Sequence, residues 1–154
     1  MKSIPIADMA ELRQRLNAWC KQRPGAPLQL SMTVGGMPLM VRGSAHLGVR
    51  TATCGALLAQ APDASALEQA GRLALGNVAL YEGGLALDDA SNSLWLSHTL
   101  HDPSPQAICS ALSALRAQTH GWKRTLTARA SREQSSPRRP TSARSIPISW
   151  TSRR

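Results

Sequence analysis

Residues 83–100 read GGLALDDASNSLWLSHTL, and the other elements can be placed relative to this segment. Its middle, residues 88–92, contains four short polar side chains, which can hydrogen-bond their own backbone and favour a turn. After the turn, apolar and polar residues alternate, and the apolar face holds Leu94, Leu96 and Leu100 together with His98. The pattern predicts a β-hairpin with one apolar side. It assigns Asp88 and Asp89 to the turn rather than to a pair of catalytic carboxylates.

A long helix is predicted to follow the hairpin. It begins at Ser104-Pro105, because a serine oxygen accepts from the free N–H groups of a first turn and a proline there loses no hydrogen bond. Apolar positions then recur at steps of four and three, as on one stripe of a helix. The stripe consists of Ile108, Leu112, Leu115, Thr119, Trp122 and Leu126. Because such a stripe needs an apolar surface to cover it, we expect the helix to pack on the hairpin.

The N-terminal part of the chain predicts another helix. Asp8 is a capping residue with Glu11 three positions later, which is the spacing of a capping box. Apolar residues follow at helical steps, namely Met9, Leu12, Leu16 and Trp19. Residues 23–25, which read RPG, end this helix.

Three strands are expected next. Residues 28–34 alternate between apolar and polar, Gly35-Gly36 is a tight hairpin turn, and residues 37–41 continue the alternation. Pro38 lacks an N–H, which predicts that one side of this second strand is unpaired there, as at a sheet edge. The third strand is expected over residues 45–53, with Leu47 and Val49 facing inward.

Ser65 and Glu68 have the spacing of a second capping box and predict a helix whose apolar positions are Leu67, Ala70 and either Leu73 or Ala74. The element order is then helix, three strands, helix, two strands, helix (α-β-β-β-α-β-β-α). We therefore expect residues 1–126 to form one α+β domain, in which helices pack on an antiparallel sheet.

Residues 127–154 differ from the domain in composition. They hold seven arginines and one glutamate, a net charge of +6, whereas residues 1–126 have a net charge of +3. They are rich in serine, arginine and proline and have no apolar period, so we expect them not to order themselves. They are either a disordered arm or sequence unrelated to the packing of the domain.

The cysteines Cys20, Cys54 and Cys109 are odd in number and far apart, which predicts neither a disulfide framework nor a zinc site. The first residues contain no apolar run like that of a signal peptide, and no segment approaches the roughly 20 apolar residues of a membrane span. We expect a reduced, soluble, cytoplasmic protein that does not bind a membrane.

Four features of the sequence point to one family. Residues 73–77 read LALGN, residues 83–88 read GGLALD, residues 94–96 read LWL, and the last helix contains Trp122. In this order of elements, they resemble the class I chaperones of bacterial type III secretion systems, the Tir-chaperone-like (CesT-like) family. The resemblance covers residues 6–126. It implies a bacterial, non-enzymatic homodimer, or a dimer with a related chaperone, that binds the unfolded N-terminal segment of an exported effector and uses no cofactor.

The resemblance also implies two sets of site residues. Subunits of this family pair through the second helix and the following strand, which here gives Leu73, Leu75, Val78, Leu85 and Leu87. The effector lies on apolar patches of the first helix and the first three strands, which here gives Leu16, Leu30, Met32, Met37, Leu39, Met40 and Leu47. Flexible methionines adapt to varied partners, but the same three methionines are also suited to filling the core.

Other chemistry was weighed against these roles. His98 and His101 could offer two imidazoles to a metal, but they have no carboxylate or cysteine at ligand spacing, so no metal site is expected. No phosphate-binding loop or nucleophile motif occurs, and Trp19, Trp95 and Trp122 are expected to pack rather than to stack on bases. The alternative function is nucleic-acid binding through the arginines of residues 127–154, which would release counterions from phosphates.

Overall fold

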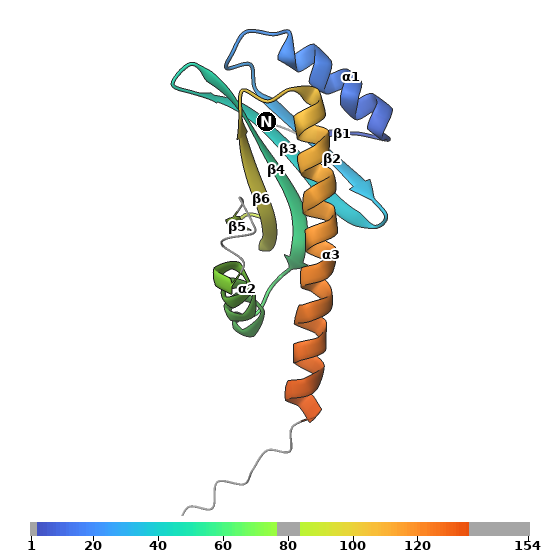
Figure 1. The fold of residues 1–154 in the computed structure, drawn as a ribbon, viewed down its shortest axis with the longest axis vertical. Helices are drawn as coiled ribbons and strands as arrows, with labels where there is room; N and C mark the ends of the chain where they lie inside the picture. Colours follow the sequence, from blue (N-terminus) through green and yellow to red (C-terminus); the bar gives the residue numbers. More distant parts are fainter. Residues whose placement is uncertain (1–2, 77–83, 136–154) are drawn as a thin grey trace, which may run out of the picture.

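The computed structural model describes residues 3–76 and 84–135. It contains a six-stranded sheet in the order β1-β2-β3-β4-β6-β5 and three helices that pack on it, so the chain has the expected α+β fold (Figure 1). All neighbouring strands are antiparallel except β1 and β2, which are parallel. The elements are β1 (Ile4–Pro5), α1 (Met9–Cys20), β2 (Leu28–Val34), β3 (Met37–His46), β4 (Val49–Gln60), α2 (Ala64–Gly76), β5 (Gly84–Asp88), β6 (Ser93–His101) and α3 (Pro105–Ser135). The predicted element order is confirmed, with the short strand β1 added in front of it.

The helices α1 and α3 cover the same face of the sheet. Figure 1 shows α3 running along the length of the sheet, with α1 crossing near its N-terminal end and α2 lying beside β5 and β6. The strand residues that face the helices alternate with residues that face the opposite side, as the predicted hairpins require. We call the side away from α3 the open face.

The core lies between this sheet and the two helices. At its centre α3 lies over β4, whose core-facing residues Ala52, Cys54 and Ala56 are small and completely buried. Small side chains on the strand let the helix approach closely, so the larger apolar side chains of α3 fill the layer. The predicted stripe is confirmed, since Ile108, Leu112, Leu115, Thr119 and Trp122 are all buried.

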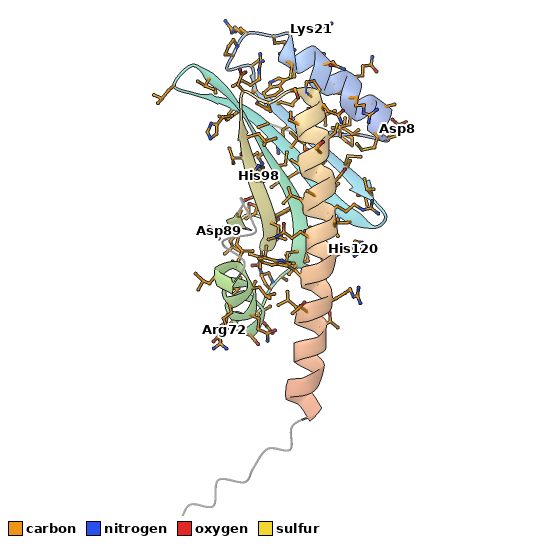
Figure 2. The ribbon with its side chains drawn as sticks, in the orientation of Figure 1. Asp8, Lys21, Arg72, Asp89, His98 and His120 are labelled. Carbon is orange, nitrogen blue, oxygen red and sulfur yellow. The ribbon has the colours of Figure 1, made fainter. Side chains whose placement is uncertain are left out.

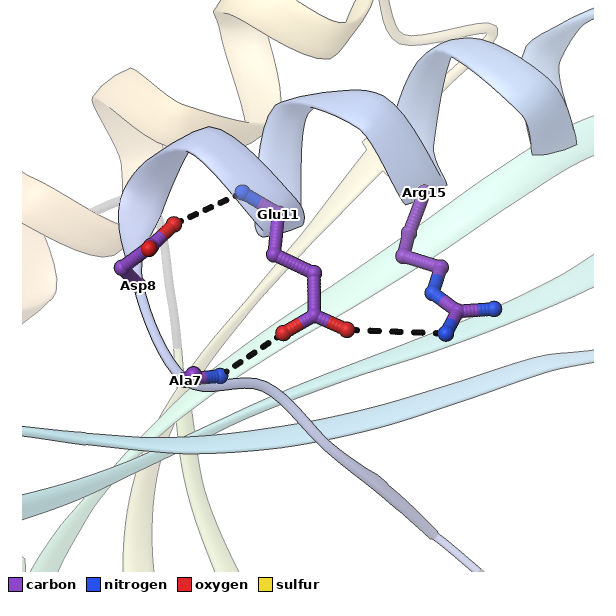
Figure 3. A network of polar contacts seen from close by, with 4 residues as sticks. All are labelled: Ala7, Asp8, Glu11 and Arg15. Carbon is purple, nitrogen blue, oxygen red and sulfur yellow. Dashed lines mark hydrogen bonds and ion pairs between the residues drawn. The ribbon is translucent and has the colours of Figure 1, made fainter.

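Two of the three predicted helix starts are confirmed in atomic detail. In α1, the Glu11 N–H donates to Asp8 Oδ1 at 2.8 Å, and the Ala7 N–H donates to Glu11 Oε2 at 2.9 Å (Figure 3). In α3, the Ala107 N–H donates to Ser104 Oγ at 3.1 Å. The bonds from the Glu11 and Ala107 N–H groups satisfy donors that the first turn of a helix leaves without an intrahelical partner, and the bond from Ala7 holds the residue before the cap.

The predicted start of α2 is wrong by two residues. Its cap is Asp63, whose Oδ1 accepts from the Ala66 N–H at 2.7 Å, and the helix begins at Ala64. Ser65 and Glu68 lie inside the first turns, where Glu68 pairs with Arg72 at 2.6 Å. Asp and Ser both cap helices, and the sequence offered both two residues apart.

The expected third strand is also corrected. The turn falls at Leu47-Gly48, so β4 begins at Val49 and runs on to Gln60. Leu47 and Val49 do not face inward, because their side chains are 91% and 44% exposed.

The strand containing Pro38 is internal to the sheet, but its pairing with β4 begins only at Leu39. The predicted gap at Pro38 is therefore present on that side, although the strand as a whole is not an edge.

Trp19 fixes the end of α1 against the sheet. Its indole N–H donates to the Ala26 carbonyl at 2.7 Å, and the guanidinium of Arg50 lies 5.1 Å from the centre of its ring. Gly43 leaves the space that the ring occupies, because a Cβ at that position would overlap the indole. The predicted role of Trp19 in packing is confirmed.

The helix α3 continues past Leu126 to Ser135, whereas residues 127–135 were expected not to order themselves. The reason is local, since residues 128–134 read ARASREQ and consist mainly of good helix formers. Helical structure here follows from propensity and continuation of an existing helix rather than from an apolar period.

Candidate interaction surfaces

Exposed leucines gather on α2 and β5, at one edge of the sheet. Leu75 is 78% exposed, Leu87 is 49% exposed and Leu67 is 37% exposed. The two elements contact each other, and β5 is the last strand of the sheet on this side. We call Leu67, Leu75 and Leu87 the leucine surface. Exposed apolar side chains on two elements that contact each other make this part of the described chain a candidate interaction site.

Four of the five residues expected to pair two subunits can be placed. Leu75 and Leu87 belong to the leucine surface, whereas Leu73 and Leu85 are half-buried and pack against the core. Val78 lies outside the described residues. The neighbouring ion pair of Arg72 with Glu68 is exposed, and Figure 2 shows Arg72 on the outer side of α2. An exposed ion pair therefore lies on the same helix as Leu67 and Leu75.

Most residues expected to contact an effector lie in the core. Leu16, Leu30, Met32, Met37 and Leu39 are each between 0% and 8% exposed. They pack between the sheet and the helices, so in this conformation they offer no surface to a guest. These five positions therefore form no exposed patch in the described conformation, and Met32 and Met37 fill the core.

Met40 and Leu47 are the exceptions. Leu47 stands at the tip of the turn between β3 and β4 in the left-handed conformation, with φ 51°. Met40 is on the open face, where it pairs with Ser31 of β2 and with Gly55 of β4.

Trp95 and Met40 meet on the open face across a glycine. A Cβ at Gly55 would lie 2.8 Å from Met40 Cε and 3.5 Å from Trp95 Cε3, so both side chains lie over this position. The Trp95 indole N–H donates to Ser93 Oγ at 2.8 Å. Trp95 and Met40 also line a groove of about 500 Å³ that extends across β2 and β3 to Pro5 and Ile6 at the β1 edge of the sheet. Trp95 is thus half-buried, unlike Trp19 and Trp122. Its alternation with the leucines of β6 was the signal for this placement.

The opposite edge of the sheet is covered by the N-terminal segment. Ile4 and Pro5 pair with Leu30 and Ser31 of β2, and the Ile6 N–H donates to the Ser31 carbonyl at 2.8 Å. The side chain of Ile6 is 6% exposed. This strand was not expected from the sequence, because a segment of so few residues contains no full period of alternation.

The titratable groups of the described chain are mainly structural. Burial raises the pKa of the Cys54 thiol to about 12, and nearby Cys109 adds to the rise. Burial also raises the pKa of Cys20, partly offset by Arg50. His98 is on the helix-covered face of β6, opposite the buried Cys54 of β4, whereas His101, three residues further along, is on the open face. Asp88 accepts from Ser91 Oγ at 2.7 Å within the predicted turn.

Within residues 3–76 and 84–135, no three His, Cys, Asp or Glu side chains are grouped so that they could hold a metal ion. In the same part of the chain, none of the helices combines the length and the apolar character needed to cross a membrane. No family model matches the chain, and no curated protein matches its sequence.

Proposed function

We propose that this protein is a chaperone that binds an extended, unfolded segment of an exported protein and keeps it ready for type III secretion. It acts as a dimer in the bacterial cytoplasm and binds stoichiometrically, without catalysis or a cofactor. The observation that supports this most is the leucine surface, because Leu75 and Leu87 are residues that the family resemblance had named for subunit pairing and both are exposed. The element order agrees with the same resemblance.

The leucine surface suits a symmetric dimer. In a twofold pair the same patch meets itself, so α2 and β5 of one protomer would lie against those of its partner. Covering apolar surface stabilises by roughly 25 cal/mol per Å². The outer edge of β5 adds main-chain donors and acceptors to this contact, as at other sheet edges.

The unpaired main-chain groups at a sheet edge also suit the binding of an extended guest. A sheet edge offers main-chain hydrogen bonds to any sequence, and neighbouring apolar pockets select side chains. Such a site needs no reacting group, which fits a protein that holds its partner rather than changing it.

Subunit pairing is tested by light scattering on the full chain. We expect a mass of about twice 16.5 kDa. Leu75→Asp places a charge in the leucine surface and should give a monomer, whereas the control Leu47→Asp, at a side chain that is 91% exposed elsewhere, should stay dimeric. A wild-type chain that is monomeric at all concentrations, alone and with extract of the source cell, would overturn the dimer.

Guest binding is tested by purifying the tagged chain from its source cell. We expect the N-terminal region of one exported protein to co-purify at a fixed ratio. Recovery of no exported protein, or of many proteins without a fixed ratio, would contradict the proposed function.

A second candidate is nucleic-acid binding. The observation in its favour is the net charge of +6 in residues 127–154, which follows Lys123 and Arg124 on α3. A chain ending at Ser135 keeps α3 and removes five of the seven arginines of residues 127–154. If the protein binds nucleic acid, the shortened chain should lose the salt-dependent binding of a single-stranded RNA that the full chain shows. If the protein is a chaperone, the shortened chain should still bind its guest.

A further inference from the structure

The strand β1 covers only a small part of its neighbour. It pairs with Leu30 and Ser31, although β2 extends from Leu28 to Val34. The Ile6 N–H extends the contact by one bond to the Ser31 carbonyl. A longer strand on this edge would therefore form more main-chain hydrogen bonds with β2 than β1 does.

Pro5 makes β1 a poor template for further strands. Because the Ile6 N–H points to β2, the alternation of the ladder directs the nitrogen of Pro5 away from β2, toward the outer edge. Proline offers no donor there, which is one way in which proteins protect sheet edges. With β1 in place the edge is blunted, and without β1 the donors and acceptors of β2 are open.

The side chain of Ile6 seals the core at this edge. It lines a small apolar pocket with Leu12 of α1, Leu30 and Met32 of β2, Leu39 of β3 and Leu112 of α3. Leu30, Met32 and Leu39 are three of the buried residues that the resemblance had assigned to effector binding. They become accessible from this side when Ile6 leaves.

The chain is anchored directly after Ile6. The Ala7 N–H is held by Glu11 Oε2, and Asp8 caps the same turn, as Figure 3 shows. Glu11 also pairs with Arg15 at 3.5 Å. Residues 3–6 can therefore leave β2 while α1 keeps its cap.

We propose that the edge of β2 and the Ile6 pocket form the binding site for an extended guest segment, and that β1 is an internal occupant which the guest displaces. The occupant is a polypeptide strand parallel to β2 with a branched aliphatic side chain at the position of Ile6. The inference rests on the proposed function for the identity of the guest. The pairing of β1 with β2 and the burial of Ile6 show that the site accepts a parallel strand with an aliphatic side chain.

The test uses the full-length protein and a fluorescent peptide of residues 1–8. The tethered β1 competes at an effective concentration of about millimolar, so the wild type should bind the peptide weakly. Ile6→Ala weakens the internal occupant and should lower the apparent Kd at least tenfold. The control Ile4→Ala changes a side chain of the same strand that is 40% exposed, and it should stay within about twofold of wild type. A peptide that carries Ile6→Asp should bind the Ile6→Ala protein at least tenfold more weakly than the unchanged peptide binds that same protein.

Equal affinity of the two protein variants, or of the two peptides, would overturn the proposal. A covalent lock gives an answer even if Ile6→Ala does not fold. Pro5 and Ser31 are register partners, so Pro5→Cys with Ser31→Cys can be joined, with Cys20→Ser in both samples to prevent mispairing. The oxidised protein should lose peptide binding and reductant should restore it, whereas equal binding by both forms would contradict displacement.

The outcomes separate this site from the proposed function. An exported protein that co-purifies equally with locked and unlocked chains would overturn the site and leave the chaperone function standing. Peptide binding that follows the predicted order, with no exported protein recovered, would support the site and overturn the function.

Discussion

Thr119 places a hydroxyl in the apolar stripe of α3. The residue is completely buried, and its Oγ1 has no hydrogen-bond partner among the described residues. A buried polar group without a partner costs about 1–3 kcal/mol. We expect Thr119→Val, which keeps the shape, to raise the free energy of unfolding by about 1 kcal/mol in urea titrations.

Thr125 is the matched control on the same helix. Its hydroxyl is exposed and donates to the Gly121 carbonyl at 3.1 Å, so Thr125→Val should change stability by less than about 0.5 kcal/mol. Equal effects of the two substitutions would show that Thr119 does have a partner.

Cys54 links the stability of the fold to alkaline pH. Its pKa is raised from 9.0 to about 12, first by burial, so the folded state keeps the proton that an unfolded chain releases. The stabilisation is fully present below pH 9 and is lost as the pH rises toward 12. Between pH 8 and pH 10.5 we expect this group to lower the free energy of unfolding by about 2 kcal/mol.

The measurement compares urea unfolding of wild type and Cys54→Ala across this pH range. Lysines and other alkaline groups titrate in both proteins, so the difference in slope isolates Cys54. Parallel curves for the two proteins would mean that the thiol is not protected from ionisation in the fold.

At the scale of elements, α1 is seated on β3 through one glycine. A Cβ at Gly43 would overlap the Trp19 ring and come within 2.8 Å of Leu28 Cβ, neither of which can move easily. We expect Gly43→Ala to destabilise the fold by about 2 kcal/mol, because overpacking displaces the helix end. Chemical denaturation, with near-UV circular dichroism of the Trp19 environment, measures the effect.

Gly55→Ala is the comparison, since it also adds a methyl group to a central strand. There the first atom met is the end of Met40, a flexible side chain at 2.8 Å on the open face. The loss should be clearly smaller than at Gly43. A larger loss at Gly55 would mean that Trp95 and Met40 are held more rigidly than α1.

Helices were more predictable from the sequence than strand ends. The stripes of α1 and α3 repeat over several turns, and their caps at Asp8 and Ser104 act within four residues, so local information is sufficient. The turn at Leu47 was missed because a leucine there adopts φ 51°, which local preference disfavours. Strand β1 depends wholly on its pairing with β2, which no local pattern encodes.

The candidate surfaces were only partly predictable for the same reason. Alternation correctly grouped Leu30, Met32 and Leu39 on one face, but it could not tell whether that face is covered. Burial was decided by α1, α3 and Ile6, which arrive from elsewhere in the chain. Leu75 and Leu87 were identified through the family resemblance, and their exposure depends on the absence of a covering element among the described residues.

For the whole molecule, the two edges of the sheet are treated differently. The β2 edge is closed by a strand of the same chain, and the β5 edge carries exposed leucines beside α2. The two edges are separated by the full width of the sheet. A chain can therefore form a dimer through its β5 edge and bind a guest at its β2 edge at the same time. This arrangement predicts that guest binding leaves the dimer intact.

Dimerisation through the leucine surface also predicts how heat stability depends on concentration. If folding and pairing are coupled, a hundredfold rise in protein concentration adds about 2.7 kcal/mol per dimer by mass action, which is about 1.4 kcal/mol per chain. At roughly 2–4 °C per kcal/mol for a chain of this size, Tm should rise by about 3–5 °C between 1 and 100 µM. Differential scanning fluorimetry should find this rise in wild type and in Leu47→Asp but not in Leu75→Asp. A Tm of the wild type that does not change with concentration, or a rise that persists in Leu75→Asp, would mean that these leucines are covered by something other than a second copy.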